Sequence, residues 1–342
     1  MAAPSEMFLP SQSLLTGAAD ALQLKVWLGE LLGAYQRGLQ VAPFLGSKTI
    51  TVGNSWQLPM YGYSDSGKHH VEGESILTDS GYRQRVPFKE RLMYVDKPYV
   101  INEFTPDWTE MQTHYESRSI LLNSFAERHA RRTDYLACRA IIKAARSAAN
   151  ITGGSTTAEQ RTPAGSSKNN AGGDTAPADC THADLLTDGS RLVTALFAAA
   201  TRLDENDVPG DGRIALLRPA QYYAIVTNRE LLDRDVVREN GDFADGTVFK
   251  CANIRLVKTN AIATAAVNQA ASATGEIVDY SGDFSTNAGI VFRMDAARRL
   301  IRMGMEIQAW YEKERFGHVV TTRQIDGFNV ERPEAAVELC TS

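Results

Sequence analysis

The sequence predicts an α+β protein, in which helices and strands occupy separate stretches of the chain. Apolar residues recur at helical spacing in residues 22–39 and again in residues 107–149. Residues 49–101 are instead rich in Val, Ile, Tyr and Phe and are punctuated by Pro and Gly, which is typical of strands. From residue 184 onward, short helical and strand patterns alternate. With 342 residues, the chain is long enough for two domains.

Composition and charge argue against several classes of protein. The chain is 43% hydrophobic and 23% charged, and its net charge of −5 differs from the clustered basic charge of a nucleic-acid-binding protein. No apolar run approaches the roughly 18 residues that span a bilayer, so no membrane partner is expected. No basic residue precedes Lys25, so no signal peptide is expected. The cysteines lie far apart in sequence, which favours free thiols: Cys138, Cys180, Cys251 and Cys340.

The strand-like region predicts a long ribbon. Two β-rich stretches, residues 49–63 and 82–101, are separated by the polar, turn-prone residues 64–81. This order indicates two paired strands with an irregular tip. An isolated two-stranded ribbon is only marginally stable in water. Another copy of the same chain is therefore the simplest candidate to cover it.

The tip contains a near-match to a nucleotide-binding motif in residues 62–70, "GYSDSGKHH". Three residues fit the phosphate-cradling pattern G-x-x-x-x-G-K-[ST]: Gly62, Gly67 and Lys68. However, His69 replaces the hydroxyl residue, and no helical period follows to supply amide donors to a phosphate. His69 and His70 are adjacent, so their rings would point to opposite faces of a strand, and a joint metal site with Glu72 is not expected. We interpret the motif as the tip of a loop.

No other stretch predicts a catalytic, cofactor or metal site. Cys180 and His182 lack a second pair of ligands nearby. The acidic residues 203–212 place Val208 and Pro209 where a calcium loop needs an acid or amide and a glycine. Hydrolase, zinc-protease and kinase motifs are absent from the sequence. An enzyme is disfavoured, and no cofactor is expected.

A long helix is predicted from Asp107 to about Ala149, which would be a rod of roughly 60 Å if unbroken. Asp107 and Glu110 form a capping box at its start. A basic cluster interrupts its apolar stripe: Arg128, Arg131 and Arg132. Contact with DNA is one interpretation of the cluster. A solvated helix face, partly paired to Glu127 and Asp134, is the favoured one.

The rest of the chain alternates between loops and regular elements. Residues 151–183 have almost no large apolar side chains and predict a flexible surface loop, and residues 261–288 predict a second one. Helices are expected at residues 191–203 and from Pro219, which occupies the favoured first-turn position. Strands are expected at residues 213–217, 255–258 and 289–294 and on both sides of Gly317, and residues 333–340 close the chain.

Five stretches, in the right order, carry a family resemblance. They are residues 24–35 (LKVWLGELLGAY), 53–62 (GNSWQLPMYG), 114–119 (HYESRS), 203–226 (LDENDVPGDGRIALLRPAQYYAIV) and 330–339 (VERPEAAVEL). The fourth is the strongest, because it combines a helix end, an Asn-x-Val-Pro turn, an Arg-led strand and a Tyr-bearing helix. On these residues the chain resembles a major capsid protein of tailed double-stranded DNA phages with the Hong Kong 97-type fold, most similar to the short-tailed phages related to T seven. The resemblance fails in the two predicted loops, residues 151–183 and 261–288.

The resemblance implies a division of the chain into named parts. They are an N-terminal arm (1–45), an extended β-hairpin loop (46–100), a peripheral domain with a long spine helix (101–150 and 300–327), a flexible insertion (151–183) and an axial domain (184–299 and 328–342). It also implies that the chain forms hexamers and pentamers that close into an icosahedral shell around double-stranded DNA. The partners implied are further copies of the chain, a scaffolding protein during assembly, a portal protein at one vertex, packaged DNA bound without sequence specificity, and a cement or decoration protein. The location implied is the virion, with assembly in the host cytoplasm.

Apolar side chains on the protruding segments are the predicted contacts between subunits. They are Trp56, Tyr61 and Phe88 in the extended loop, and Trp27 and Leu31 in the arm. The alternative for each is packing within its own subunit. Two other functions remain open: an encapsulin-type cellular nanocompartment with the same fold, and a soluble α/β enzyme.

Overall fold

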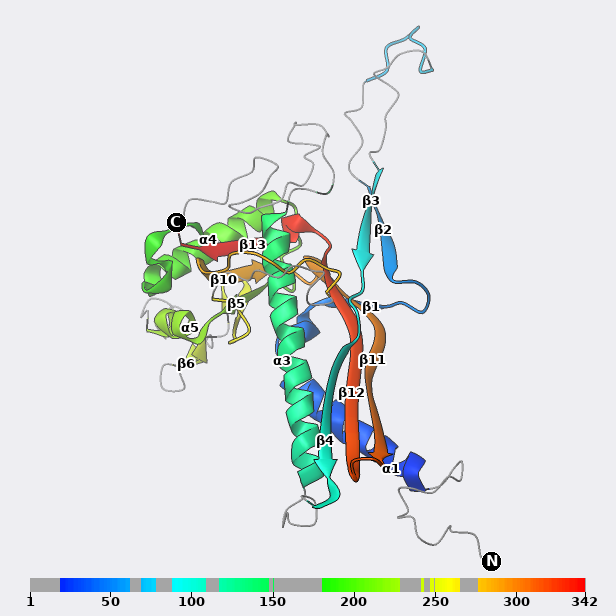
Figure 1. Cartoon of the computed structure of the whole chain (residues 1–342). Helices are drawn as coiled ribbons and strands as arrows, with labels where there is room; N and C mark the ends of the chain where they lie inside the picture. Colours follow the sequence, from blue (N-terminus) through cyan, green and yellow to red (C-terminus); the bar gives the residue numbers. More distant parts are fainter. Residues whose placement is uncertain are drawn as a thin grey trace, which may run out of the picture.

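A computed structural model of the chain describes residues 19–61, 69–77, 88–108, 117–147, 150, 180–227, 241–242, 247–248, 250–264 and 276–341. The helices are α1 (Ala19–Gly38), α3 (Ser117–Arg146), α4 (Gly189–Glu205) and α5 (Pro219–Val226), with short 3-10 turns η3 (Ala42–Phe44), η5 (Ala183–Leu186) and η6 (Pro333–Ala335). The strands are β1 (Gly46–Thr49), β2 (Ser55–Tyr61), β3 (Phe88–Tyr94), β4 (Tyr99–Pro106), β5 (Ile214–Leu217), β6 (Gly241–Asp242), β7 (Thr247–Val248), β8 (Lys250–Cys251), β9 (Ile254–Lys258), β10 (Asn287–Phe292), β11 (Ala297–Glu312), β12 (Gly317–Val330) and β13 (Ala336–Cys340). They form an elongated sheet layer, an α/β body beside one end of α3, and a ribbon that projects beyond both (Figure 1).

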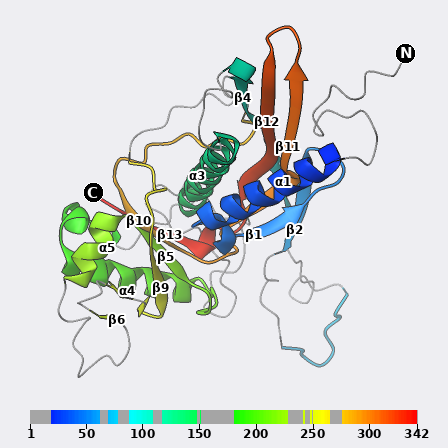
Figure 2. The ribbon, with the colours of Figure 1, turned by 90° about the horizontal axis from the view of Figure 1, so that it is seen from below.

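The elongated layer is a four-stranded sheet in the order β1-β11-β12-β4. Both α1 and α3 pack against it, and Figure 2 shows α1 crossing beside α3. Leu31 of α1, Phe125 of α3, and Met305 and Val320 of the sheet are buried in one shared core. The apolar side chains that the sheet contributes to this core lie on its helix-covered face.

The α/β body is a five-stranded sheet in the order β13-β10-β5-β9-β8, packed with α4 and α5. All four residues of β5 are buried, as expected for a continuous apolar run inside a sheet. The Asp188 carboxylate caps α4 by accepting the Ser190 N–H at 2.9 Å. Gly189 is required at the crossing of α4 and α5, because a Cβ there would lie 2.0 Å from the carbonyl oxygen of Ala224.

Helix α3 joins the two cores. Its 30 residues extend about 45 Å. Its first half contributes Leu122 and Phe125 to the core of the sheet layer, and its second half contributes Leu136 and Ile141 to the core of the α/β body. The helix therefore sets how the two parts sit relative to each other.

Asp134 of α3 holds the chain where α1 ends. Its carboxylate accepts the backbone N–H groups of Gln40, Val41 and Ala42 at 2.8–3.0 Å. Pairing of Asp134 with the basic cluster, expected from the sequence, is therefore wrong, because the carboxylate is buried and its oxygens are used by the backbone.

A buried polar network ties α1 and the sheet together around Asp326. Arg299 donates to the Asp326 carboxylate from Nε and Nη2 at 3.1 and 2.9 Å, and Gln324 donates to it at 2.8 Å. Arg299 and Gln324 also donate to the hydroxyl of Tyr35 in α1, at 2.7 and 3.1 Å. Buried charges are tolerated when they are paired and hydrogen-bonded in this way.

Several element boundaries differ from those that the sequence predicts. The long helix is described from Ser117 to Arg146, with a helical turn at 107–108; residues 109–116 lie outside the described part. The capping box therefore stays a prediction, and the Asp107 carboxylate accepts a hydrogen bond from Tyr311 at 2.8 Å. Most of residues 151–183 also lies outside it. Residues 276–286 belong to no helix or strand, as predicted, but β10 starts at Asn287, inside the predicted second loop.

Candidate assembly surfaces

The ribbon formed by β2 and β3 has two unlike faces. Its antiparallel register places Trp56 opposite Met93 and Leu58 opposite Arg91, so these residues share one face. On that face Trp56 and Leu58 are half-buried and Met93 is fully buried. They pack with Leu300 of the chain's own sheet. This side is the inner face of the ribbon.

The outer face of the ribbon is exposed and mixed, with large apolar side chains beside polar Gln57 and Glu90. It carries Phe88, Leu92 and Tyr94, whose side chains are 77%, 48% and 41% exposed, together with exposed Pro59. Soluble monomers rarely expose large apolar side chains in a contiguous group. A ribbon of this kind also leaves the outer edges of both strands open to pairing. The outer face thus keeps three large apolar side chains exposed in the single subunit.

Hydrogen bonds fix the root of the ribbon on the body. The Asn329 side chain donates to the Tyr94 carbonyl at 2.7 Å and accepts the Tyr94 N–H at 3.0 Å, which imitates one step of strand pairing. Gly327 permits this approach, because a Cβ there would lie 2.6 Å from the Tyr94 carbonyl oxygen. Arg91 is hydrogen-bonded to Asn150, whose amide donates to the Glu331 carbonyl at 2.7 Å.

A buried carboxylate holds the next residues of the root. Asp96 accepts the N–H groups of Ile277 and Val278 at 2.8 and 2.9 Å and the Tyr280 hydroxyl at 2.8 Å. The same hydroxyl accepts the Phe328 N–H at 2.8 Å. Burial raises the pKa of Asp96, although the two N–H donors partly oppose that shift. The loop at 276–280, the sheet and the ribbon root therefore form one unit.

The tip of the ribbon is described at residues 69–77. Gly73 has a φ of +92°, and the Glu74 N–H donates to the Val71 carbonyl at 3.1 Å, which makes a turn and not a helix. The phosphate-loop residues Gly62, Gly67 and Lys68 lie outside the described residues. Large apolar side chains are exposed here too: Val71, Ile76 and Leu77.

The predicted contact residues fall into different environments. Phe88 lies on the outer face of the ribbon, and Tyr61 is its register partner. Trp56 lies on the inner face, where the guanidinium of Arg298 sits 5.5 Å from its ring. Leu31 is fully buried within its own subunit, which is the alternative considered for it. Trp27 is in α1, with its side chain outside the described part.

A second exposed apolar group, not selected from the sequence, lies at the far end of the sheet layer. Trp108 and Phe316 are 71% and 70% exposed, and the Asp107 N–H donates to the Phe316 carbonyl at 3.0 Å, so the two residues are neighbours. Trp108 lies in the helical turn that directly follows β4. In the sequence, Pro106 directly before this turn was the available signal that the strand ends there.

The described residues show neither a metal cluster nor an exposed thiol. No group of three His, Cys, Asp or Glu side chains in them could hold a metal ion. The four cysteines are all buried, and burial raises the pKa of Cys251 to about 11. No helix within the described ranges is long and apolar enough to cross a membrane.

A long helix laid along an elongated sheet, an α/β body and a projecting ribbon form the fold that this chain shares with solved phage capsid structures. Residues 57–340 match the sequence profile of the Gp10A-like major capsid proteins, and the chain belongs to this family. It is a structural protein of tailed phages that self-assembles into an icosahedral shell, a virion component and not an enzyme.

Solved structures agree with this assignment. The capsid structure of the cyanophage P-SCSP1u is similar to the chain with 26% identity and a TM-score of 0.71, covering 87% of this chain and 86% of that one. The mature capsid of bacteriophage PhiM1 shares the fold at 13% identity and a TM-score of 0.68, covering 89% and 87%. A virus-like particle from Pyrococcus furiosus shares it at 10% identity and 0.52, covering 93% and 99%. The nanocompartment alternative is thus less favoured. No curated protein sequence matches significantly.

Proposed function

We propose that the ribbon of each subunit lies over a neighbouring subunit in the shell, with its outer face packed against the neighbour's four-stranded sheet. The single observation that carries this is the exposure of Phe88, Leu92 and Tyr94 on one face of a ribbon whose other face packs against the chain's own sheet. Burying apolar area yields roughly 25 cal/mol per Å², so covering this row favours association.

The receiving surface is the sheet face opposite α1 and α3. The register places Trp310, Val319 and Phe104 in one row across β11, β12 and β4. The apolar side chains that the sheet gives to the core with α1 and α3 lie in the alternate rows, so this row faces away from the helices. Trp310 is half exposed. A neighbour's apolar ribbon fits a face with an uncovered tryptophan.

Assembly then follows from many weak contacts. A closed shell fixes every subunit through several neighbours at once, so no single contact has to be strong. We assign residues 1–45 to an arm, 46–100 to the extended loop, 101–150 with 300–327 to a peripheral domain, and 184–299 with 328–342 to an axial domain, with 151–183 as an insertion. Tyr61 and Trp27 join the outer contacts in this assignment.

The same assignment extends to partners and place. A scaffolding protein guides assembly in the host cytoplasm, a portal protein occupies one vertex, a cement or decoration protein binds the finished shell, and double-stranded DNA fills the shell without sequence-specific contact. Support for these partners is the family membership of the chain.

The test compares two substitutions on adjacent residues of β3. Phe88→Gln removes an outer-face side chain, and Lys89→Gln changes an exposed residue on the inner-face side of the same strand. We expect Phe88→Gln to reduce the yield of closed shells seen by electron microscopy severalfold, and Lys89→Gln to leave it near wild type. Equal shell yields for Phe88→Gln and the wild type would refute the contact.

A further inference from the structure

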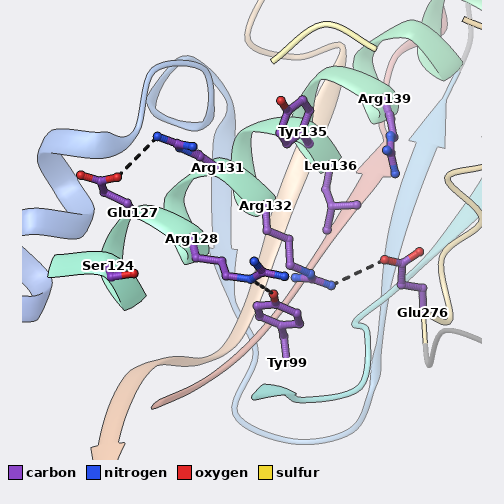
Figure 3. A pocket seen from close by; sticks show the side chains of 10 residues that line it. All are labelled: Tyr99, Ser124, Glu127, Arg128, Arg131, Arg132, Tyr135, Leu136, Arg139 and Glu276. Atoms are coloured by element: carbon purple, nitrogen blue, oxygen red, sulfur yellow. Dashed lines mark hydrogen bonds and ion pairs between the residues drawn. The ribbon is translucent and has the colours of Figure 1, made fainter. Parts of the chain in front are cut away.

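A groove of about 650 Å³ runs along the exposed side of α3 (Figure 3). Its cations are all arginines: Arg128, Arg131, Arg132 and Arg139. Tyr99 of β4 and Tyr135 and Leu136 of α3 line it with ring and apolar surface, and Glu127 and Glu276 are its carboxylates. Arginines therefore outnumber carboxylates in the groove. This local charge contrasts with the net charge of −5 of the whole chain.

The groove arginines differ in how they are neutralised. Arg132 lies 3.8 Å from Glu276 and 3.7 Å from Asp326, and its guanidinium stacks 4.3 Å from the centre of the Tyr99 ring. Arg131 is 3.4 Å from Glu127, with both side chains largely exposed. Arg128 donates to the Tyr99 hydroxyl at 3.4 Å and has no carboxylate within ion-pair distance among the described residues. Charge is thus left over at the solvent side of the groove.

In the next stretch of α3, the basic side chains are paired with carboxylates and carbonyl groups of the same chain. Lys143 pairs with Asp279 at 2.7 Å, and Arg146 pairs with Glu338 at 2.6 Å and donates to the Asp283 carbonyl. The loop at 276–286 thus covers this end of α3 with acids and carbonyls. Residues 261–275, which precede Glu276, contain no Asp or Glu. That part of the loop therefore has no carboxylate to offer the groove.

We infer that the groove contacts phosphate groups of the packaged double-stranded DNA, and that α3 accordingly faces the interior of the shell. Guanidinium groups present a planar fork of donors that matches phosphate oxygens, and contacts to phosphate carry no sequence preference. Carboxylates within the groove keep the attraction weak, which suits a container that must release its DNA. The orientation of α3 rests on the proposed function. If a neighbour's ribbon covers the sheet face opposite α1 and α3, then α3 lies on the other surface of the shell.

An acidic protein segment is the rival occupant. DNA is favoured because, under the proposed function, double-stranded DNA fills the shell that the protein forms. Direct binding measurements with each kind of ligand distinguish the two occupants.

The test measures binding of a fluorescent 30-base-pair duplex, and separately of poly-glutamate, to the unassembled full-length chain by anisotropy at several salt concentrations. The variant Arg128→Gln/Arg131→Gln removes two exposed groove cations. The control Lys313→Gln/Arg315→Gln removes the same charge from the exposed turn between β11 and β12. We expect the groove variant to bind the duplex about tenfold more weakly and its logarithmic salt slope to fall by about two, one per phosphate contact. The control keeps the slope of the wild type.

Three results would overturn the inference: no duplex binding by the wild type, equal losses in both variants, or groove-dependent binding of poly-glutamate without binding of the duplex. Because the groove lies away from the outer face of the ribbon, the groove variant should still form shells. A failed DNA experiment with normal shells therefore leaves the ribbon contact standing. Loss of the ribbon contact in the Phe88→Gln experiment does not alter duplex binding by the unassembled chain.

Discussion

In the α/β body, apolar side chains meet one another inside a single chain, whereas in the ribbon they alternate between a sheltered and an exposed face. Phe284 and Phe292 of the body are fully buried. Phe88, of the same residue type, is mostly exposed on the ribbon. The difference teaches that burial within one subunit accounts for the stability of the body, whereas the outer face of the ribbon is left for the contact between subunits that we propose. The predictions below separate the two contributions by measuring the free energy of unfolding of the unassembled chain.

The largest loss is expected in the body. Phe284→Ala removes a fully buried ring that also lies 5.3 Å from the Arg146 guanidinium. Large-to-small changes at such positions cost about 3–5 kcal/mol, because a cavity remains. Urea unfolding of the unassembled chain should show a loss of that size. A loss under about 1 kcal/mol would mean that the body is not a well-packed core.

A pH-dependent loss comes next, in the layer between α3 and the sheet. Buried His129 shares a hydrogen bond with Thr322 at 3.0 Å and lies edge-on to Tyr99. Burial, and then the nearby Arg132 cation, lower its pKa from 6.5 to about 4. The unfolded chain therefore takes up this proton first, and stability falls as pH drops from about 6.5 to about 4, by about 3 kcal/mol at most.

The contribution of His129 is isolated by comparing urea unfolding of the wild type and His129→Gln across this pH range. The wild type should lose more stability than the variant on acidification, since Asp96 and the other carboxylates are shared by both. Parallel curves would show that His129 does not titrate in this range.

A smaller effect is expected at the ribbon root. Asn329→Ala leaves the Tyr94 N–H and carbonyl without their side-chain partner, which costs about 1–3 kcal/mol where such groups are buried. Hydrogen exchange should show faster exchange of the Tyr94 amide in the variant and little change in the α/β body. Unchanged exchange at Tyr94 would show that the Asn329 side chain does not hold the ribbon root in place.

The smallest effect is expected on the outer face of the ribbon. Phe88→Gln changes an exposed side chain with no place in the chain's own hydrophobic clusters, so unfolding of the unassembled chain should shift by no more than about 0.5 kcal/mol. The same variant is expected to assemble poorly. A stability loss comparable to that of Phe284→Ala would place Phe88 in the subunit's own core.

Local patterns predicted much of this architecture. Helical spacing marked α1 and most of α3, strand-rich composition with Pro and Gly marked the ribbon, and β5 and α5 followed from an apolar run and Pro219. The sequence did not predict which ribbon residues lie on the inner face and which on the outer face, because a shift of one residue in strand register exchanges the two faces. Trp56 and Phe88 were therefore grouped together although they lie on opposite faces.

Contacts between distant residues were equally beyond local patterns. Asp134 looked like a partner for nearby arginines, and only the fold brings Gln40, Val41 and Ala42 to it. The arginine cluster of α3 was visible in the sequence, but the groove also needs Tyr99 and Glu276, which come from other parts of the chain. Leu31 could not be told from an exposed residue of α1 without knowing which helix side meets α3.

Thiol labelling at position 88 tests the covered ribbon most directly. The four native cysteines are buried, so Phe88→Cys adds one accessible thiol to a low background. A maleimide should label it rapidly in the unassembled chain and at least tenfold more slowly in closed shells, where a neighbouring subunit covers it. Equal labelling rates in the two states would contradict the idea that the outer face is buried between subunits.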